Sequence, residues 1–312
     1  MKSYKIIEDD VLNQLEVLAW DSPFHAILSD PPYGLSFMNK KWDSMTAPQF
    51  QAWVTEWATL MLNVVYPGAV LMMFGGTRTY HRLACGLEDA GWEIYDSLAW
   101  MYGSGFPKSH DISKALDRAA GAEREAIRLH HNPASSLGNG RTMDGGAAQS
   151  AVHITAPATP AAKRWQGYGT ALKPAFEPIV LARAPRTDTY ARHALMYGTG
   201  ALNIDGCRIE PTEPDGRLLR DAKNYKTPSM FGAMGGSKAV GRTTLGRWPA
   251  NVLLDEEAAA VLDEQSGESG ASRFFYTAKA STWERSAGLD GKNTHPTVKP
   301  IKLTTYLATL LL

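Results

Sequence analysis

Short apolar runs that alternate with amphipathic segments most constrain how this chain folds. Phe24–Ser29 is mostly apolar and ends in Asp-Pro-Pro, as expected for a buried strand that stops where proline forbids further pairing. Apolar residues recur at helical spacing over Ala47–Val65, and Pro67-Gly68 is expected to end that helix. A second buried strand, Ala69–Phe74, follows.

The alternation continues in helices and strands that we expect at Arg78–Ala90, Trp92–Tyr102, Glu177–Ala182, Trp248–Leu254, Glu256–Glu264 and Ile301–Leu312. Buried strands alternating with helices predict an α/β fold on a parallel sheet. Ligands of such folds lie beyond the carboxyl ends of the strands, and Asp30 follows directly after one of them.

Composition excludes several other classes of protein. With 44% hydrophobic residues in 312, the chain has enough apolar surface for a globular core. It contains no apolar window long enough to span a membrane, and its N-terminus lacks the apolar core of a signal peptide, so we expect a cytoplasmic protein. Two cysteines and eight histidines without metal-ligand spacing predict no metal site.

The charge is neutral overall but unevenly distributed. The segment 216–248 has one acid and seven basic residues, so its net charge is +6 and that of the remaining chain is −6. The basic residues are Arg217, Arg220, Lys223, Lys226, Lys238, Arg242 and Arg247. We interpret the segment as a long loop that meets phosphate, and a solvated surface loop is an equally good alternative.

The sharpest motif is Asp30-Pro31-Pro32-Tyr33, which resembles the catalytic motif of DNA amino-methyltransferases of the permuted β type. Further segments resemble the same family in the same order, and the likeness is greatest to phage and prophage modification methylases of the restriction-modification kind. These segments are Pro67-Gly68, Phe74–Arg78, Gly91–Ile94, Tyr102–Ser109, Lys173–Pro178 and Thr294–Pro300.

The resemblance implies a Rossmann-like class I fold that binds S-adenosylmethionine (SAM) and methylates an exocyclic amine of a flipped-out base. Asp30 and a proline carbonyl of Pro31 or Pro32 would accept the two amine protons and draw the lone pair out of the ring plane. Proline fixes that carbonyl because its φ is locked and it has no N–H. Tyr33 would stack on the base.

Residues implied to bind the cofactor are Asp10, Asp30, His295, Pro296, Thr297 and Lys299. Asp10 occupies the place of the family aspartate that holds the adenine of SAM, although Asp9 replaces the usual glycine. An alternative is that Asp10 stabilises a helix N-terminus. Thr297 and Lys299 would hold the carboxylate of the cofactor, and the alternative there is a proline-rich linker before a core helix.

The glycine-rich cofactor loop of the family has no counterpart before Leu312. We therefore expect a truncated chain, or one completed by a second chain or a homodimer. In either case the sheet would be incomplete at an edge and the apolar helix at the end would lack partners.

Composition and the resemblance together divide the chain into a catalytic half at 1–120, a return strand at 166–183, a target-recognition region at 184–272, and a cofactor-side segment with its helix at 273–312. Between the first two lies a flexible insertion at 121–165, which we expect because the stretch is dense in Ala, Gly, Ser and Pro and poor in large apolar residues. The expected activity is methylation of adenine N6 in double-stranded DNA, because the cytosine-N4 members of the family more often have Ser in place of Asp30. Alternatives are cytosine N4, a non-catalytic DNA-binding fragment or subunit, and methylation of RNA or protein glutamine.

Overall fold

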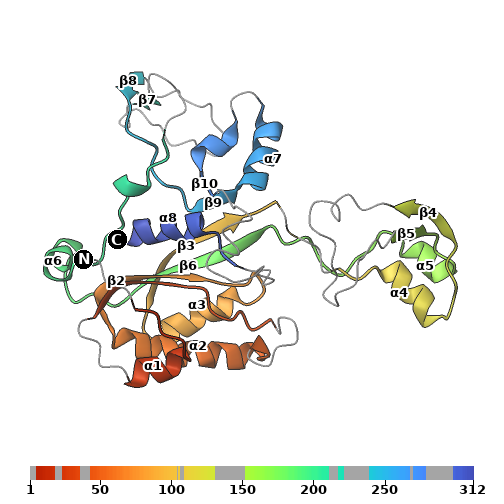
Figure 1. The fold of residues 1–312 in the computed structure, drawn as a ribbon, viewed down its shortest axis with the longest axis horizontal. Coiled ribbons are helices and arrows are strands. Elements are labelled where there is room, and N and C mark those ends of the chain that lie inside the picture. The colour runs from red at the N-terminus through yellow and green to blue at the C-terminus, as the bar shows by residue number, and fades with distance from the viewer. Residues whose placement is uncertain are drawn as a thin grey trace, which may run out of the picture. The chain divides into compact units, whose positions relative to one another are not determined.

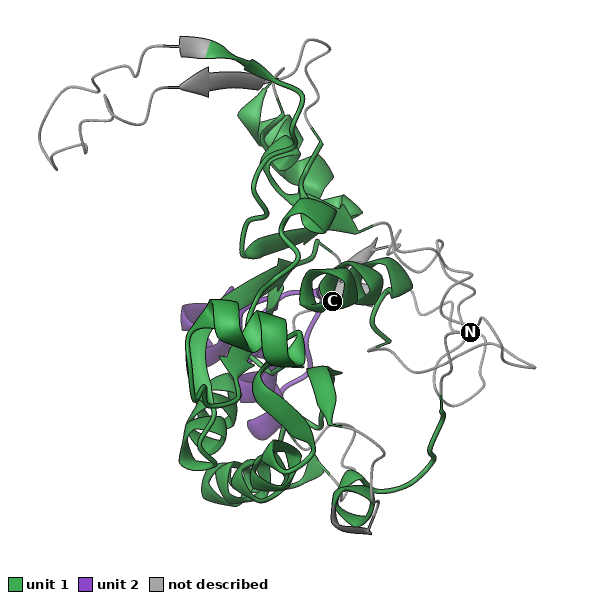
Figure 2. Ribbon diagram, turned by 90° about the vertical axis from the view of Figure 1, so that its left-hand side faces the viewer, with its two compact units in different colours: residues 1–104, 175–312 green, residues 105–174 purple. Residues whose placement is uncertain are grey.

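The computed structural model describes residues 5–17, 23–35, 43–103, 105, 109–130, 152–210, 217–220, 239–267, 270–278 and 298–312. The chain forms two compact units, one made of residues 1–104 and 175–312 and the other of residues 105–174 (Figure 2).

The larger unit is built on a six-stranded sheet, which confirms the predicted α/β class. Its strands, in spatial order, are β1 (Phe24–Ser29), β2 (Val65–Phe74), β6 (Phe176–Arg183), β3 (Glu93–Met101), β9 (Val252–Asp255) and β10 (Tyr276–Ala278). The expectation of a parallel sheet is wrong for one strand, because β6 runs antiparallel to both β2 and β3. Neighbouring antiparallel strands need no crossover helix, and here the chain passes from β3 through the unit 105–174 to β6.

Helices cover both faces of the sheet (Figure 1). On one face lie α1 (Val11–Val17), α2 (Ala47–Leu62) and α3 (Tyr80–Asp89), and on the other lies α8 (Ile301–Leu311). Successive side chains of β2 point to opposite faces of the sheet, so the strand contributes to the core on each face. Leu71 and Met73 pack toward α2 and α3, whereas Val70, Met72 and Phe74 belong to the core that includes α8.

The start of α2 and the junction to β2 illustrate how local sequence sets the elements. Thr46 and Gln49 form a capping box that satisfies the first backbone N–H groups of α2. The helix ends at Leu62 and β2 begins at Val65, so the prediction that Pro67-Gly68 separates helix from strand is wrong. Proline and glycine are instead accommodated where the pairing of β1 with β2 shifts register, and Gly68 has a φ of 75° there.

The expectation that the last helix lacks partners is also wrong. Leu303 and Leu307 of α8 are completely buried, and the ring of Tyr306 stacks on Tyr276 of β10 at 3.7 Å between centroids. The Tyr306 hydroxyl donates to the carbonyl of Cys207 at 3.2 Å. One face of α8 therefore packs into the hydrophobic core on its side of the sheet.

The unit 105–174 contains α4 (Ile112–Ala119), α5 (Pro160–Arg164) and a hairpin of β4 (Ala126–His130) with β5 (Val152–Thr155). The predicted flexible insertion 121–165 therefore has regular structure at both ends. The sequence signals for this structure are weak, because the stretch is dominated by Ala, Gly and Pro. They are the alternation of apolar and polar residues along β4 and β5 and the N-capping Thr159 before α5.

The predicted recognition region contains α6 (Tyr190–Tyr197), a 3-10 turn η4 (Asp205–Cys207) and α7 (Glu256–Ser266), and the turn η6 (Ala271–Phe274) spans its end. Within the basic segment, β7 (Arg217–Arg220) pairs antiparallel with β8 (Ala239–Thr243), so the segment is not a loop throughout. No helix in the described ranges is long and apolar enough to cross a membrane.

Candidate active site

Asp30 lies at an edge of the sheet where three strands meet. It follows the last residue of β1, and β2 ends at the same edge because it is parallel to β1. The antiparallel β6 begins there, and the Gly75 N–H after β2 donates to the Pro178 carbonyl of β6 at 2.9 Å. This topology brings Glu177, near the start of β6, to the side of Asp30.

Four side chains form what we call the Asp30 cluster: Asp30, Tyr33, Glu177 and Lys299. Lys299 Nζ lies 3.0 and 2.9 Å from the two carboxylate oxygens of Asp30 and 3.1 Å from Glu177 Oε2. The Tyr33 hydroxyl lies 2.8 Å from Asp30 Oδ1 and 3.0 Å from Glu177 Oε2, and its oxygen accepts from Lys299 at 3.1 Å. Residues distant in sequence, on β6 and just before α8, thus complete a single network.

The cluster is unevenly exposed to solvent. The side chain of Lys299 is 7% exposed, whereas that of Asp30 is 37% exposed. The ammonium also lies 4.8 Å from the centroid of the Phe74 ring and 5.5 Å from that of Tyr33, within the range of cation–π attraction. The buried cation therefore supports a carboxylate that faces outward.

Burial, with the carboxylates of Glu177 and Asp30, raises the pKa of the Tyr33 hydroxyl far above its ordinary value. Tyr33 consequently remains a neutral hydrogen-bond donor at physiological pH. Two carboxylates and one ammonium then leave the cluster with one net negative charge. Burial also raises the pKa of the Tyr102 hydroxyl, and the negative charge of Glu177 adds to this effect.

Hydrogen bonds with the side chains of Asp43 and Thr79 fix the Asp-Pro-Pro-Tyr loop and the two residues after it. The buried carboxylate of Asp43 accepts from the Gly34 N–H at 2.7 Å and from the Leu35 N–H at 3.1 Å. The Thr79 hydroxyl donates to the Tyr33 carbonyl at 2.6 Å. A Cβ at Gly76 would lie 2.9 Å from Leu35 Cδ1, so the Leu35 side chain packs directly against this glycine.

The predicted site residues are distributed as follows. Asp30, Tyr33 and Lys299 come together, and Pro31 and Pro32 lie in the same loop. Asp10 accepts from the Leu12 N–H at 2.9 Å at the start of α1, which agrees with its alternative interpretation as a helix N-terminal acid. His295, Pro296 and Thr297 lie outside the described residues.

The predicted DNA-binding residues are only partly described. Arg217 and Arg220 belong to β7 and Arg242 to β8, where Arg242 is exposed. The Arg247 guanidinium lies 5.2 Å from the centroid of the Phe274 ring. Lys223, Lys226 and Lys238 lie outside the described residues.

Sequence reasoning missed Glu177 as a member of the site. The signal was present, because an acid stands near the start of the otherwise apolar strand Phe176–Arg183. A buried strand seldom includes a carboxylate without a partner, and here the partner is Lys299 at 3.1 Å. The described residues contain no group of His, Cys, Asp and Glu arranged to hold a metal ion.

Comparison with known proteins assigns the chain to a family. A family model described as DNA methylase, of the N6/N4 methyltransferase type, matches residues 24–310. The chain belongs to this DNA methylase family. Membership agrees with the predicted class I methyltransferase fold and covers the Asp30 cluster from β1 to α8. No curated protein sequence matches the chain.

Solved structures of DNA methylases are among the structural matches. The complex of M1.HpyAVI with SAM has 13% sequence identity and a TM-score of 0.23, covering 53% of this chain and 46% of that protein. TTHA0409 of Thermus thermophilus, assigned as a DNA modification methylase and solved with SAM, has 12% identity and a TM-score of 0.28, covering 59% and 56%. The chain thus spans about half the length of the solved structures that it matches.

Proposed function

We propose that the Asp30 cluster is the active site of a site-specific DNA methyltransferase that transfers a methyl group from SAM to N6 of adenine. One observation carries the proposal: an outward-facing carboxylate stands on a proline-fixed loop and is held by the buried ammonium of Lys299 and by the hydroxyl of Tyr33. Family membership over residues 24–310 supports a DNA substrate.

In this proposal Asp30 accepts a hydrogen bond from the exocyclic amine and a proline carbonyl accepts the second. Both bonds favour an amine whose lone pair has left the plane of the ring, which is the form that reacts. Asp30 is preorganised because Lys299 Nζ contacts both of its oxygens, at 3.0 and 2.9 Å. The ring of Tyr33 is proposed to stack on the flipped base.

The chemistry of the cluster suits SAM, which supplies an electrophilic methyl group on a positively charged sulfonium. The net negative charge from Asp30, Glu177 and Lys299 favours a cation at this edge of the sheet. We assign Lys299 to the positioning of Asp30, since it is ion-paired with Asp30 and Glu177. Asp10, His295, Pro296 and Thr297 remain the proposed contacts to the rest of the cofactor.

Adenine is the preferred target because the motif has Asp and not Ser at position 30. Double-stranded DNA would be bound through the recognition region 184–272, whose hairpin of β7 and β8 contains three of the predicted basic residues. Cytosine N4 is the second candidate, and both amines would use Asp30 in the same way.

The test measures transfer of tritiated methyl from SAM to duplex DNA by the parent protein and by Asp30→Asn. We expect the substitution to reduce the rate by at least about 100-fold, because the amide removes the charge that polarises the amine. Glu93→Gln is the matched control, since its carboxylate is similarly exposed, at 46%, pairs with Arg183 at 3.0 Å and lies outside the recognition region. Full activity of Asp30→Asn would remove Asp30 from the reaction.

A further inference from the structure

The unit 105–174 is basic although it lies outside the segment predicted to bind DNA. It contains nine Lys and Arg against five Asp and Glu, a net charge of +4, so the remaining chain has a net charge of −4. No acid occurs from Gly145 to Phe176, whereas Lys163, Arg164 and Lys173 fall within that stretch. A stretch of this charge is complementary to a polyanion.

Two aromatic rings stand beside these cations on the surface. Every residue from Lys163 to Phe176 is exposed, with Trp165 at 42% and Tyr168 at 58%. The rings of Trp165 and Tyr168 meet edge to face at 4.9 Å between centroids. We call Lys163, Arg164, Trp165 and Tyr168 the α5 surface. Exposed aromatic side chains next to cations are typical of surfaces that bind another molecule.

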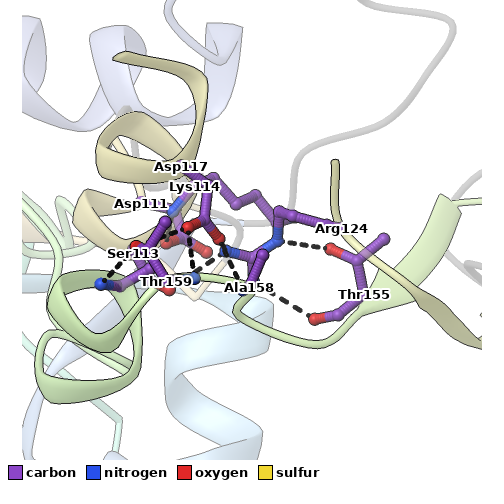
Figure 3. A network of polar contacts seen from close by, with 9 residues as sticks. Asp111, Ser113, Lys114, Asp117, Arg124, Thr155, Ala158 and Thr159 are labelled. Carbon is purple, nitrogen blue, oxygen red and sulfur yellow. Dashed lines mark hydrogen bonds and ion pairs between the residues drawn. The ribbon is translucent and has the colours of Figure 1, made fainter. Parts of the chain in front are cut away.

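A buried polar network fixes the helix that presents this surface (Figure 3). Asp117 of α4 accepts from the Ala158 and Thr159 N–H groups, both at 3.0 Å, and from the Thr159 hydroxyl at 2.7 Å. Arg124 pairs with the same carboxylate at 2.6 Å. Thr159 in turn caps α5 by accepting from the Ala162 N–H. The start of α5 is therefore bonded to α4 and, through the Asp117 carboxylate, to Arg124 just before β4.

The loop after α5 is held through its backbone. The Ile112 N–H donates to the Tyr168 carbonyl at 3.1 Å, and the Thr170 N–H donates to Ser109 Oγ at 2.9 Å. A Cβ at Gly169 would clash with Ser109 Oγ, so the two segments approach closely. The aromatic rings are thus exposed on an ordered support, and their exposure is not a consequence of a loose chain.

We infer that the α5 surface is a second DNA-contacting surface, separate from the region 184–272. Lys163 and Arg164 would contact phosphates, while Trp165 and Tyr168 would pack their rings against the sugars of the backbone. The inference rests on the proposed function, in that duplex DNA is taken as the substrate. A polyanion is favoured over a protein partner because the stretch 145–176 lacks acids altogether.

The test compares the parent chain with the double variant Lys163→Gln/Arg164→Gln by fluorescence anisotropy of a fluorescein-labelled duplex, between about 50 and 200 mM salt. Loss of two phosphate contacts should make the slope of log affinity against log salt shallower by about 1.8. Tyr168→Ala should also weaken binding of the duplex. The matched control is Lys114→Gln/Arg118→Gln, which removes two exposed cations from α4 of the same unit.

A parental slope in Lys163→Gln/Arg164→Gln, or an equal reduction in the α4 control, would overturn the inference, since the surface would then contribute no more than general charge. Methyl transfer distinguishes this outcome from failure of the proposed function. The α5 variant should keep the parental kcat with a raised KM for DNA, whereas a parent that transfers no methyl group would contradict the proposed function itself.

Discussion

Replacing Lys299 by methionine tests how strongly the Asp30 cluster depends on its one buried cation. Methionine retains most of the volume and the apolar stem of the side chain, so the change removes mainly the charge and its hydrogen bonds. Lys299 contacts Asp30 at 2.9 Å, Glu177 at 3.1 Å and the Tyr33 hydroxyl at 3.1 Å. Without it, two carboxylates share the single proton of Tyr33.

The magnitude follows from the burial of the partners. Breaking a buried ion pair costs about 3 to 5 kcal/mol. Asp30 is 37% exposed, so water compensates part of its loss, and we expect Lys299→Met to lower the free energy of unfolding by about 2 to 3 kcal/mol. Glu177→Gln should cost less, because Asp30 remains as a counter-ion and the amide oxygen still accepts. A double-mutant cycle of Lys299→Met and Glu177→Gln should show a coupling free energy of about 1 to 2 kcal/mol.

The assay is urea unfolding followed by circular dichroism, with the slope m compared between variants so that a change in midpoint reports stability. Arg192→Met provides the control, because Arg192 also pairs with a carboxylate at 2.8 Å but its side chain is 70% exposed. That variant should lose about 0.5 kcal/mol or less. An equal loss of unfolding free energy in Lys299→Met and Arg192→Met would refute the conclusion that the ion pairs of Lys299 stabilise the fold through burial.

Two further predictions concern packing and pH. A Cβ at Gly86 of α3 would lie 2.7 Å from Val54 Cγ1 and 2.9 Å from the Gln51 carbonyl oxygen of α2. Gly86→Ala should therefore force α2 and α3 apart and lower the free energy of unfolding in urea by about 1 to 3 kcal/mol, despite the better helix propensity of Ala. Unchanged stability would contradict this close packing. Burial raises the pKa of Asp117, but hydrogen bonds from Ala158, Thr159 and Arg124 outweigh it and lower the value to about 2. Because the folded pKa lies below the unfolded value of 3.8, the ionised form stabilises the fold above about pH 4, and this contribution is lost as the pH falls toward 2. The protection of the α4–α5 segment from hydrogen exchange in the parent, relative to Asp117→Asn at the same pH, should therefore shrink over that interval, and a constant ratio would contradict the assignment.

Much of the architecture could be predicted because the relevant signals are local. Phe24–Ser29 is apolar and stops at prolines, and the helix after Thr46 has a capping residue, a proline in its first turn and an apolar stripe. The direction of β6 could not be predicted in this way. An apolar run has the same pattern in parallel and antiparallel strands, and the direction depends on the route of the chain through the unit 105–174.

The candidate site was predictable where a motif contains its residues and not where topology assembles them. Asp30 and Tyr33 lie in one tetrapeptide, whereas Glu177 reaches them only because β6 begins at the edge where β1 and β2 end. Lys299 was expected to meet the cofactor, and its ion pairs with Asp30 and Glu177 follow from the packing of α8 on the sheet. The same packing explains why Leu303, Leu307 and Leu310 of α8 are buried.

The most direct test of the proposed function is to identify the nucleoside that the protein methylates. Duplex DNA incubated with the protein and SAM is digested to nucleosides and analysed by mass spectrometry, with Asp30→Asn treated in parallel. We predict N6-methyladenine with the parent and none with Asp30→Asn. N4-methylcytosine from the parent would contradict the adenine assignment, and methylated nucleosides from Asp30→Asn at the parental level would contradict the central role of Asp30.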